Sequence, residues 1–230
     1  MNNTKLNFNK SAKDYDDFNI IQKIVSKAVV NDIKNKPQNI LELGCGTGDV
    51  YRQISWQTNS YKAVDFSQNM CDKHIKDNHI EVCCLDFDQD SFFDNIKGEK
   101  YDLVVSSSAL QWSKDLDKLL FNIQKTTDYI VMALFTSNTF KTIFDISNTV
   151  SPIISIQEIK TTFGKYFNCD FETHSYHLMF QNQKEMFNMI KKSGVSGNKR
   201  LNYKQAKNLW QNYSLDYLEF EVIYITGRKL

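Results

Sequence analysis

The stretch Leu41-Glu42-Leu43-Gly44-Cys45-Gly46-Thr47-Gly48 decides the fold of this chain, because three glycines follow a short apolar run at alternate positions. The apolar run predicts a β-strand, and the segment 49–56 that follows has spacing compatible with a helix. Glycine lacks a Cβ and adopts positive φ freely, so the three glycines allow a tight turn and a close backbone approach to a ligand. The stretch therefore predicts a strand that leads into a ligand-binding loop.

The spacing of these glycines differs from that of the two common phosphate-binding loops. The dinucleotide fingerprint is G-x-G-x-x-G and the triphosphate loop ends in G-K-[ST], whereas this chain has G-x-G-x-G without a following lysine. Glu42 adds a carboxylate just before the first glycine, which would repel a phosphate and attract a cationic or amine-bearing ligand. We therefore expect a ligand other than a phosphate, with a glycine-rich turn that binds nothing as the alternative.

Composition favours a single domain over residues 1–230 and gives no sign of a polyanionic partner. Hydrophobic residues make up 41% and charged residues 24%, and 28 basic residues nearly balance 27 acidic ones, which disfavours a nucleic-acid substrate. The five cysteines have no C-x-x-C pair, so we expect neither a metal site nor a disulfide framework. Because no segment resembles a signal peptide or a membrane span, the expected location is cytoplasmic, with no membrane partner.

Short apolar strands alternate with helical patterns along the chain. Strands are expected at 39–43, 61–65, 79–84, 101–106, 129–135, 171–179 and 218–226, and helices at 19–33, 115–124, 158–167 and 183–192. This order predicts an α/β fold with a doubly wound, seven-stranded, mostly parallel sheet whose last strand is antiparallel. Residues 1–36 would form N-terminal cap helices, and residues 136–157 a lid insertion that selects the substrate.

Polar or small residues stand at the predicted strand ends, where open parallel sheets bind their ligands. Asp65 ends the second strand and could accept hydrogen bonds from both hydroxyls of a ribose, or simply be a solvated strand-end cap. Asp86 follows the third strand, where a solvated loop charge is the alternative, and Ser106 begins the small-residue end of the fourth. We expect these side chains to meet at one edge of the sheet.

The pattern E-x-G-x-G-x-G resembles motif I of the class I S-adenosylmethionine-dependent methyltransferases, in which the loop passes under the amino-acid part of the cofactor. The resemblance implies a Rossmann-like fold and S-adenosylmethionine as the cofactor. It assigns Asp86 to the adenine amino group and Phe87 to the adenine ring. The cofactor-binding residues that it implies are Glu42, Gly44, Cys45, Gly46, Gly48, Asp65, Phe66, Asp86, Phe87 and Ser106.

Four further segments are similar to the malonyl-[acyl-carrier protein] O-methyltransferases of biotin synthesis. They are Phe8 to Tyr15, with the pattern F-x-x-x-A-x-x-Y, then V-D-F-S-Q-N-M at 64–70, S-S-S-A-L-Q-W at 106–112 and L-E-F-E-V-I-Y-I-T-G-R-K at 218–229. This similarity implies a monomer that methylates the free carboxylate of a malonyl thioester on acyl-carrier protein, with Tyr15, Gln111 and Trp112 positioning the substrate. Ordinary packing is the alternative for Tyr15 and Trp112.

Two other functions stay open at this stage. The A-L-Q-W block also resembles trans-aconitate methyltransferase, so a free small carboxylic acid is an alternative acceptor. A non-catalytic binding protein that retains the methyltransferase fold is the second alternative. No general base is expected, because a carboxylate with a reference pKa of about 4 is already a nucleophile. Alignment of the reactants would contribute roughly 7–11 kcal/mol. The H-x-x-H pair of His174 and His177 indicates a surface pair rather than a metal site.

The basic residues depart from the pattern of the resembled family. An arginine of the lid is expected to hold the malonyl carboxylate, but Lys141 is the only basic residue in 136–155. Lys141, Arg200, or hydroxyls and backbone N–H groups would then hold the substrate anion. An acidic carrier would need a basic surface, for which Lys191, Lys192, Lys199 and Arg200 form one candidate and a solvated face the alternative.

Overall fold

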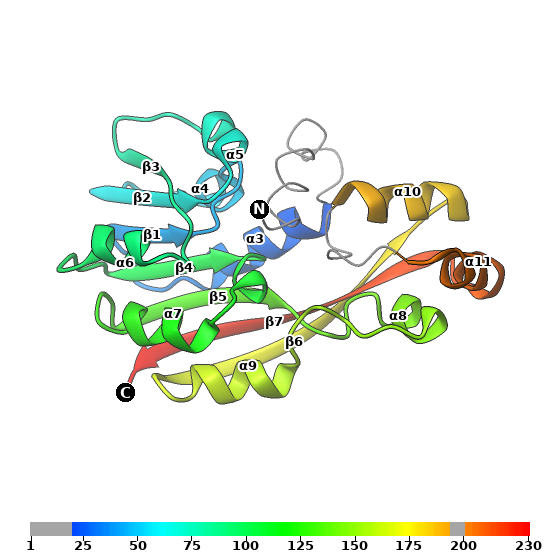
Figure 1. The fold of residues 1–230 in the computed structure, drawn as a ribbon. Helices are drawn as coiled ribbons and strands as arrows, with labels where there is room; N and C mark the ends of the chain where they lie inside the picture. The colour runs from blue at the N-terminus through cyan, green and yellow to red at the C-terminus, as the bar shows by residue number, and fades with distance from the viewer. Residues whose placement is uncertain (1–19, 194–200) are drawn as a thin grey trace.

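The computed structural model describes residues 20–193 and 201–230, which contain one seven-stranded sheet of order β3-β2-β1-β4-β5-β7-β6 (Figure 1). The first five strands are parallel to one another, and β7 is antiparallel to both β5 and β6. This confirms the predicted doubly wound α/β fold. The strands are β1 Asn39–Leu43, β2 Ser60–Asp65, β3 Ile80–Cys84, β4 Leu103–Ser107, β5 Tyr129–Phe135, β6 Phe167–Met179 and β7 Tyr217–Lys229.

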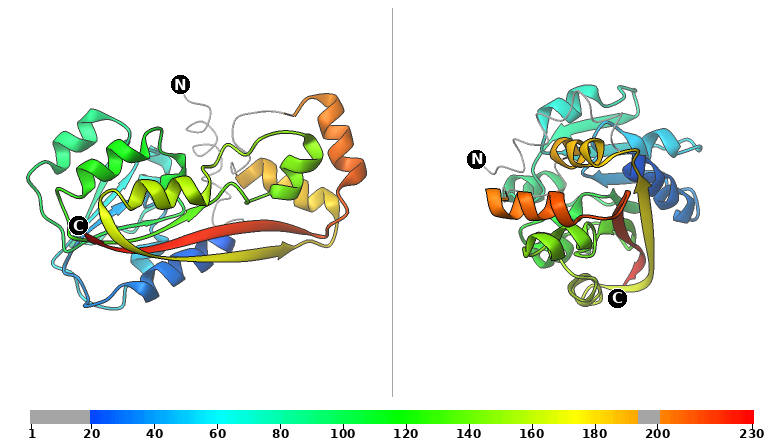
Figure 2. Two further views of the ribbon diagram at one scale, coloured as in Figure 1. Left: turned by 90° about the horizontal axis from the view of Figure 1, so that it is seen from below. Right: turned by 90° about the vertical axis from the view of Figure 1, so that its right-hand side faces the viewer.

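Helices cover both faces of the sheet. They are α3 Ile20–Asp32, α4 Asp49–Gln53, α5 Gln68–Lys73, α6 Asp90–Ile96, α7 Leu116–Ile123, α8 Lys141–Ser147, α9 Ile156–Phe163, α10 Gln183–Ser193 and α11 Tyr203–Asn212, with a 3₁₀ turn η1 at Leu110–Trp112. Figure 2 shows α3 on one face and α6, α7 and α9 on the other, and the two apolar clusters of the core divide in the same way. Two covered faces explain why all seven residues of β5 are buried.

Side-chain alternation along β1 places the site residues relative to the core. Leu41 and Leu43 belong to the cluster with α6, α7 and α9, whereas Ile40 belongs to the cluster with α3. Successive side chains of a strand point to opposite faces, so Glu42 lies on the α3 face with Ile40. A carboxylate is thereby buried just before the glycine loop.

The helix expected at 158–167 is displaced in the structure. It begins at Ile156, because Ser155 and Glu158 form a capping box, and it ends at Phe163. Phe167 instead begins β6, four residues before the predicted start, and its side chain is buried. The helices α5, α6 and α8 escaped prediction because six or seven residues are too short to show a full apolar period, and α11 because its sequence is mostly polar.

The strands β6 and β7 are 13 residues long and extend beyond the parallel strands as a two-stranded ribbon. The ribbon-end helices, which we define as α8, α10 and α11, gather at its far end, past the carboxyl ends of β1, β4 and β5 (Figures 1 and 2). Of the expected cap region 1–36, the described part is α3 and the loop after it. Within the described ranges, no helix combines the length and apolar content needed to cross a membrane.

Candidate cofactor-binding site

The glycine loop is held against the ends of β2 and β4. The Gly44 and Cys45 amides both donate to the Val64 carbonyl, at 2.7 and 3.0 Å. Gly44 has φ of 71°, and a Cβ placed there would lie 2.2 Å from the Cβ of Ala109, so only glycine fits this approach. Gly46 also has a positive φ, of 53°, but no atom of the described residues lies within 4 Å of its added Cβ. No described residue therefore fills the position beside Gly46 that a side chain would take.

Asp65 joins the end of β2 to the glycine loop. Its Oδ2 accepts a hydrogen bond from the Gly46 amide at 3.0 Å, and its Oδ1 accepts one from the Ser67 amide at 2.8 Å. Burial raises the pKa of Asp65 to about 6, against the lowering effect of these two backbone hydrogen bonds. Each carboxylate oxygen has a second lone pair, so Asp65 can accept two further hydrogen bonds from a ligand.

Glu42 is fully buried beneath the loop. Its Oε2 accepts a hydrogen bond from the Tyr61 hydroxyl at 2.6 Å, and the Tyr51 ring packs edge-on against Tyr61 at 5.0 Å. Burial raises the pKa of Glu42 to about 8, opposed by the Tyr61 hydrogen bond. Glu42 is therefore largely protonated at neutral pH in this state, and a cation placed beside it would favour its ionised form.

Near the end of β4, three buried polar atoms have no hydrogen-bond partner in the described part of the chain. Ser108 has φ of 58°, a left-handed conformation that is uncommon outside glycine, and its carbonyl accepts a hydrogen bond from Gln111 Nε2 at 2.7 Å. Ser107 Oγ, Ser108 Oγ and Gln111 Oε1 are buried, and no described residue hydrogen-bonds to them. A buried polar atom left unpaired costs about 1–3 kcal/mol, so this cluster indicates a ligand. Only the run of three serines in the sequence hinted at Ser107 and Ser108.

Ser106 and Phe87 are more deeply placed than their predicted roles require. The Ser106 side chain is fully buried and donates to the Leu43 carbonyl at 2.7 Å, which ties β4 to β1. Phe87 is 5% exposed and packs in the core, and its ring would lie 4.0 Å from a Cβ added at Gly44. Asp86 is half-buried at the end of β3, where its Oδ1 accepts from the Asp88 amide at 3.1 Å.

The comparisons with known proteins agree with this geometry. A family model described as a methyltransferase domain matches residues 41–128, which include the glycine loop, Asp65, Asp86 and the end of β4. The chain is 26% identical over 256 residues to the malonyl-[acyl-carrier protein] O-methyltransferase of Bacillus cereus, a match that covers 97% of this chain and 93% of that protein. The protein is a class I S-adenosylmethionine-dependent methyltransferase.

Two further curated relatives of the methyltransferase carry the same printed name. The Anoxybacillus flavithermus protein is 27% identical over 157 residues, and the Acetivibrio thermocellus protein is 28% identical over 120 residues. These matches cover 66% and 49% of this chain but 59% and 41% of the relatives, less than two thirds of either relative.

Solved structures share the fold of the methyltransferase at low sequence identity. YcgJ from Bacillus subtilis superposes with a TM-score of 0.64 at 12% identity, covering 89% of this chain and 97% of that one. Magnesium protoporphyrin IX methyltransferase from Synechocystis, with bound S-adenosylhomocysteine, gives a TM-score of 0.54 at 15% identity, covering 90% and 82%.

His74 lies beside the glycine loop of the candidate site, and the sequence did not single it out. Its Nδ1 lies 2.9 Å from the Ile75 carbonyl and so carries the ring proton, and the ring packs against Gly48. A Cβ added at Gly48 would lie 2.9 Å from His74 Nε2. Burial lowers the pKa of His74, which keeps the ring neutral against the loop.

Several predicted residues lie apart from this cluster or outside the described chain. Lys141 is exposed on α8 and lines an open groove of about 590 Å³ together with Asp145 and Glu158. Trp112 is half-buried and packs against the core. The residues 8–15, Lys199 and Arg200, and the side chains of Lys191 and Lys192, fall outside the described residues. His174 pairs with Glu172, and the described part of the chain has no cluster of three metal-ligating side chains.

Proposed function

We propose that this methyltransferase transfers the methyl group of S-adenosylmethionine to the free carboxylate of a malonyl thioester on acyl-carrier protein, an early step of biotin synthesis. The observation that carries the proposal is the similarity to the Bacillus cereus malonyl-[acyl-carrier protein] O-methyltransferase over 97% of this chain and 93% of that protein. We further propose that the enzyme acts as a monomer in the cytoplasm.

The residues at the strand ends match the parts of this cofactor. In the proposal, Asp65 accepts the two ribose hydroxyls with its remaining lone pairs, and Glu42 with the glycine loop holds the amino-acid part. The approach of the cofactor amine would ionise Glu42, whose pKa is about 8 before binding. Asp86, Phe87 and Phe66 would surround the adenine, while Ser106 and Cys45 shape the loop from the core.

The chain needs no general base for this reaction. S-Adenosylmethionine supplies an activated methyl on a sulfonium, and the acceptor carboxylate is ionised at neutral pH. The protein then aligns the acceptor and excludes water, work that we assign to Gln111, Trp112 and Tyr15. Oε1 of the buried Gln111 accepts no hydrogen bond from a described residue, and it is held in place because Nε2 of the same amide donates to the Ser108 carbonyl.

Lys141 or Arg200 would hold the free carboxylate of the malonyl group, which is the acceptor of the methyl group. Lys141 stands on α8 within the proposed lid 136–157, and its ammonium is exposed. The first part of that segment is fixed to β7, because Glu219 accepts hydrogen bonds from the Thr142 amide and hydroxyl at 2.9 and 2.6 Å. Any lid movement would therefore begin after Thr142.

Incubation with methyl-labelled S-adenosylmethionine and a choice of acceptors tests the proposal. We expect a labelled methyl ester on malonyl-carrier protein and none on free trans-aconitate. Methylation of trans-aconitate alone would contradict the proposal and favour an enzyme for a free small acid. Growth rescue of a biotin-requiring strain that lacks the corresponding step provides an independent measurement in the cell.

A further inference from the structure

The helix α11 presents aromatic and basic side chains to solvent on one face. Tyr203 is 85% and Trp210 is 52% exposed, and their separation of seven residues places them on the same side of the helix. Lys204 and Lys207 are exposed on that side, and the sequence of α11 contains no acidic residue. We call Tyr203, Lys204, Lys207 and Trp210 the α11 face. Exposed aromatic groups combined with charge of one sign are typical of an interaction surface.

The α11 face rests on a rigid support. The Phe187 ring of α10 packs against both Trp210 and Tyr213, with ring centroids 5.6 and 5.8 Å apart. Gln183 Nε2 donates to the Tyr213 carbonyl at 2.6 Å, and Asn208 Nδ2 donates to the Ile146 carbonyl of α8 at 2.6 Å. These contacts fix α11 to its neighbours, so a partner would meet a preformed surface.

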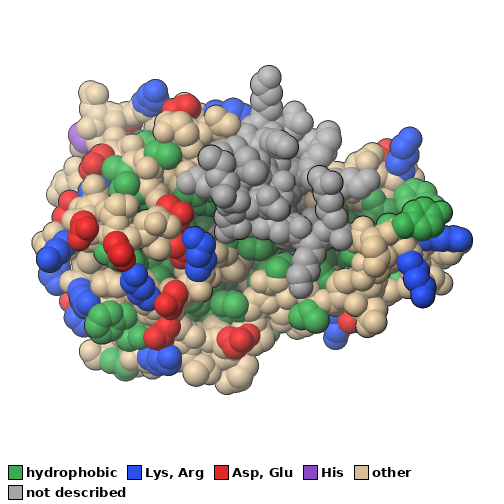
Figure 3. Space-filling view, viewed as in Figure 1, with side chains coloured by type: hydrophobic (Ala, Val, Ile, Leu, Met, Phe, Trp, Pro, Cys, Tyr) green, Lys and Arg blue, Asp and Glu red, His purple; other side chains and the backbone are tan. Residues whose placement is uncertain are grey.

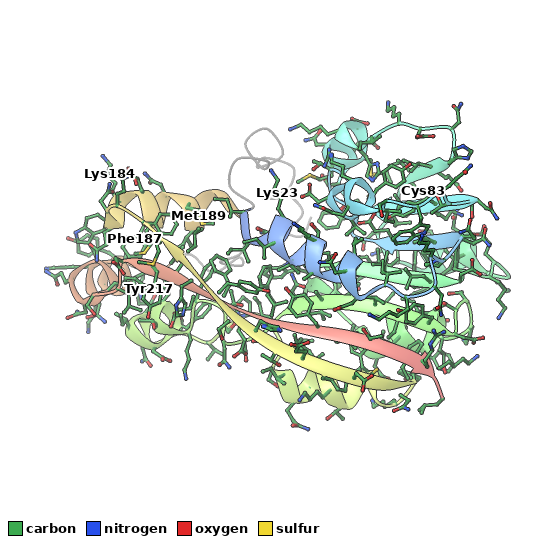
Figure 4. All side chains as sticks on the ribbon, turned by 180° about the vertical axis from the view of Figure 1, so that it is seen from behind. Lys23, Cys83, Lys184, Phe187, Met189 and Tyr217 are labelled. Carbon is green, nitrogen blue, oxygen red and sulfur yellow. The ribbon has the colours of Figure 1, made fainter. Side chains whose placement is uncertain are left out.

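The position of the α11 face suits a partner that delivers a substrate. Figure 3 shows lysine and apolar side chains gathered at the end of the molecule that α10 and α11 form. Figure 4 places Lys184 and Phe187 on α10 at the same end, which adds a further exposed lysine beside the face. This end of the molecule lies past the carboxyl ends of the parallel strands (Figure 1). The glycine loop and Asp65 lie at those carboxyl ends, on the side of the sheet that faces α10 and α11.

We infer that the α11 face is the docking surface for an acidic, helical carrier protein, which contacts Lys204 and Lys207 by charge and Tyr203 and Trp210 by apolar packing. The inference rests on the proposed function, because the partner is the carrier of the thioester. Charge complementarity selects this occupant: two lysines without an acidic neighbour on the helix attract an acidic surface and repel a basic one. The aromatic side chains then supply the buried contacts that hold the complex.

Reversal of the two lysine charges tests the inference. We expect the double variant Lys204→Glu and Lys207→Glu to raise KM for malonyl-carrier protein about tenfold, because lost attraction and new repulsion both oppose docking. Its kcat should stay unchanged, and so should KM for a small malonyl thioester such as malonyl-CoA. Tyr203→Ala should raise KM for the carrier substrate alone, with no loss of fold, since that side chain is 85% exposed.

A matched double variant controls for the change in net charge. Lys76→Glu and Lys97→Glu alter two exposed lysines in the loops before β3 and β4, at the amino edge of the sheet, and should leave KM for the carrier substrate unchanged. Equal KM values for malonyl-carrier protein in the α11 double variant and the unmodified enzyme would overturn the inference. Failure to methylate either malonyl thioester would instead overturn the proposed function, so the two failures are distinguishable.

Discussion

At the scale of single residues, Asp65 and Glu42 show how burial prepares a ligand site. Both carboxylates lie at the ends of parallel strands, where the sequence placed them, and both have a raised pKa because water is excluded. Their hydrogen-bond partners, the Gly46 amide and the Tyr61 hydroxyl, come from neighbouring strands or loops. The sequence predicted that the two acids lie near a ligand, but their hydrogen-bond partners depend on how the strands pair.

Replacement of Asp65 by Asn should weaken cofactor binding while the fold persists. The carboxylate is proposed to accept two charge-assisted hydrogen bonds, each worth about 1.5–3 kcal/mol, so the Kd for S-adenosylmethionine should rise at least about tenfold. Isothermal titration calorimetry measures this change. Asp94→Asn, which alters an exposed acid on α6, is the control and should leave Kd unchanged. If the two variants bind S-adenosylmethionine with equal affinity, Asp65 does not contribute to cofactor binding.

Glu42 should make the stability of the cofactor-free protein depend on pH. Its pKa is raised from 4.5 to about 8 in the folded state, so its contribution is fully present below pH 4.5 and is lost as pH rises through 8. Each pKa unit corresponds to about 1.4 kcal/mol, so the free energy of unfolding should fall by on the order of 3 kcal/mol between pH 5 and 8. Urea unfolding at several pH values measures this fall.

The variant Glu42→Gln isolates that contribution, because Asp65 titrates in both proteins. Glutamine keeps an oxygen for the Tyr61 hydroxyl but has no charge to bury. The difference in unfolding free energy between the variant and the unmodified protein should therefore grow from pH 5 to pH 8 in favour of the variant. A constant difference over this range would show that Glu42 does not titrate there.

At the scale of elements, the glycine loop uses positive φ at three positions for different reasons. An added Cβ would meet Ala109 at Gly44 and the His74 ring at Gly48, whereas at Gly46 it would meet no atom of the described residues within 4 Å. The alternate spacing predicted a tight loop, but it did not distinguish these positions. The difference arises because Ala109 and His74 belong to other elements, which the chain brings to the loop only after the sheet has formed.

Gly44→Ala should destabilise the protein much more than Gly98→Ala. Both positions have positive φ, of 71° and 83°, so both variants carry a backbone cost of about 1–2 kcal/mol. At Gly44 the new methyl also collides with Ala109, which adds about 1–3 kcal/mol, whereas nothing described lies within 4 Å at Gly98. Thermal unfolding measures the loss of stability of each variant. Similar losses for the two variants would contradict the packing of the loop against η1.

At the scale of the whole molecule, the β6–β7 ribbon carries the ribbon-end helices to the edge of the sheet that holds the glycine loop. Two glutamates of β7 accept hydrogen bonds from the segment that follows β5. Glu221 accepts from the Thr136 hydroxyl and the Asn138 side-chain amide, and Glu219 accepts from Thr142 in the first turn of α8. The Phe140 ring packs on Phe220 at 4.9 Å between these contacts. The chain that follows β5 is thus fixed to the ribbon along its first residues.

Glu219→Ala should loosen this attachment. The Thr142 amide and hydroxyl would both lose their acceptor, at a cost of about 1–3 kcal/mol in unfolding free energy, and amide hydrogen exchange in 140–147 should accelerate. Glu185→Ala, an exposed acid on α10, serves as the control and should change neither quantity by more than a few tenths of a kcal/mol. Unchanged exchange in the Glu219 variant would contradict the attachment.

The sequence by itself determined the seven-stranded sheet, its glycine loop and the acids at the strand ends, because strand periodicity and glycine spacing are local properties of the chain. It also placed the serine run at the end of β4. Only the tertiary structure decided which buried polar atoms have no partner among the described residues, how His74 supports the loop, and where α11 presents its aromatic and basic face. Those features depend on contacts between residues far apart in the chain. Burial, which raises the pKa of Glu42 and Asp65, exists only in the folded protein.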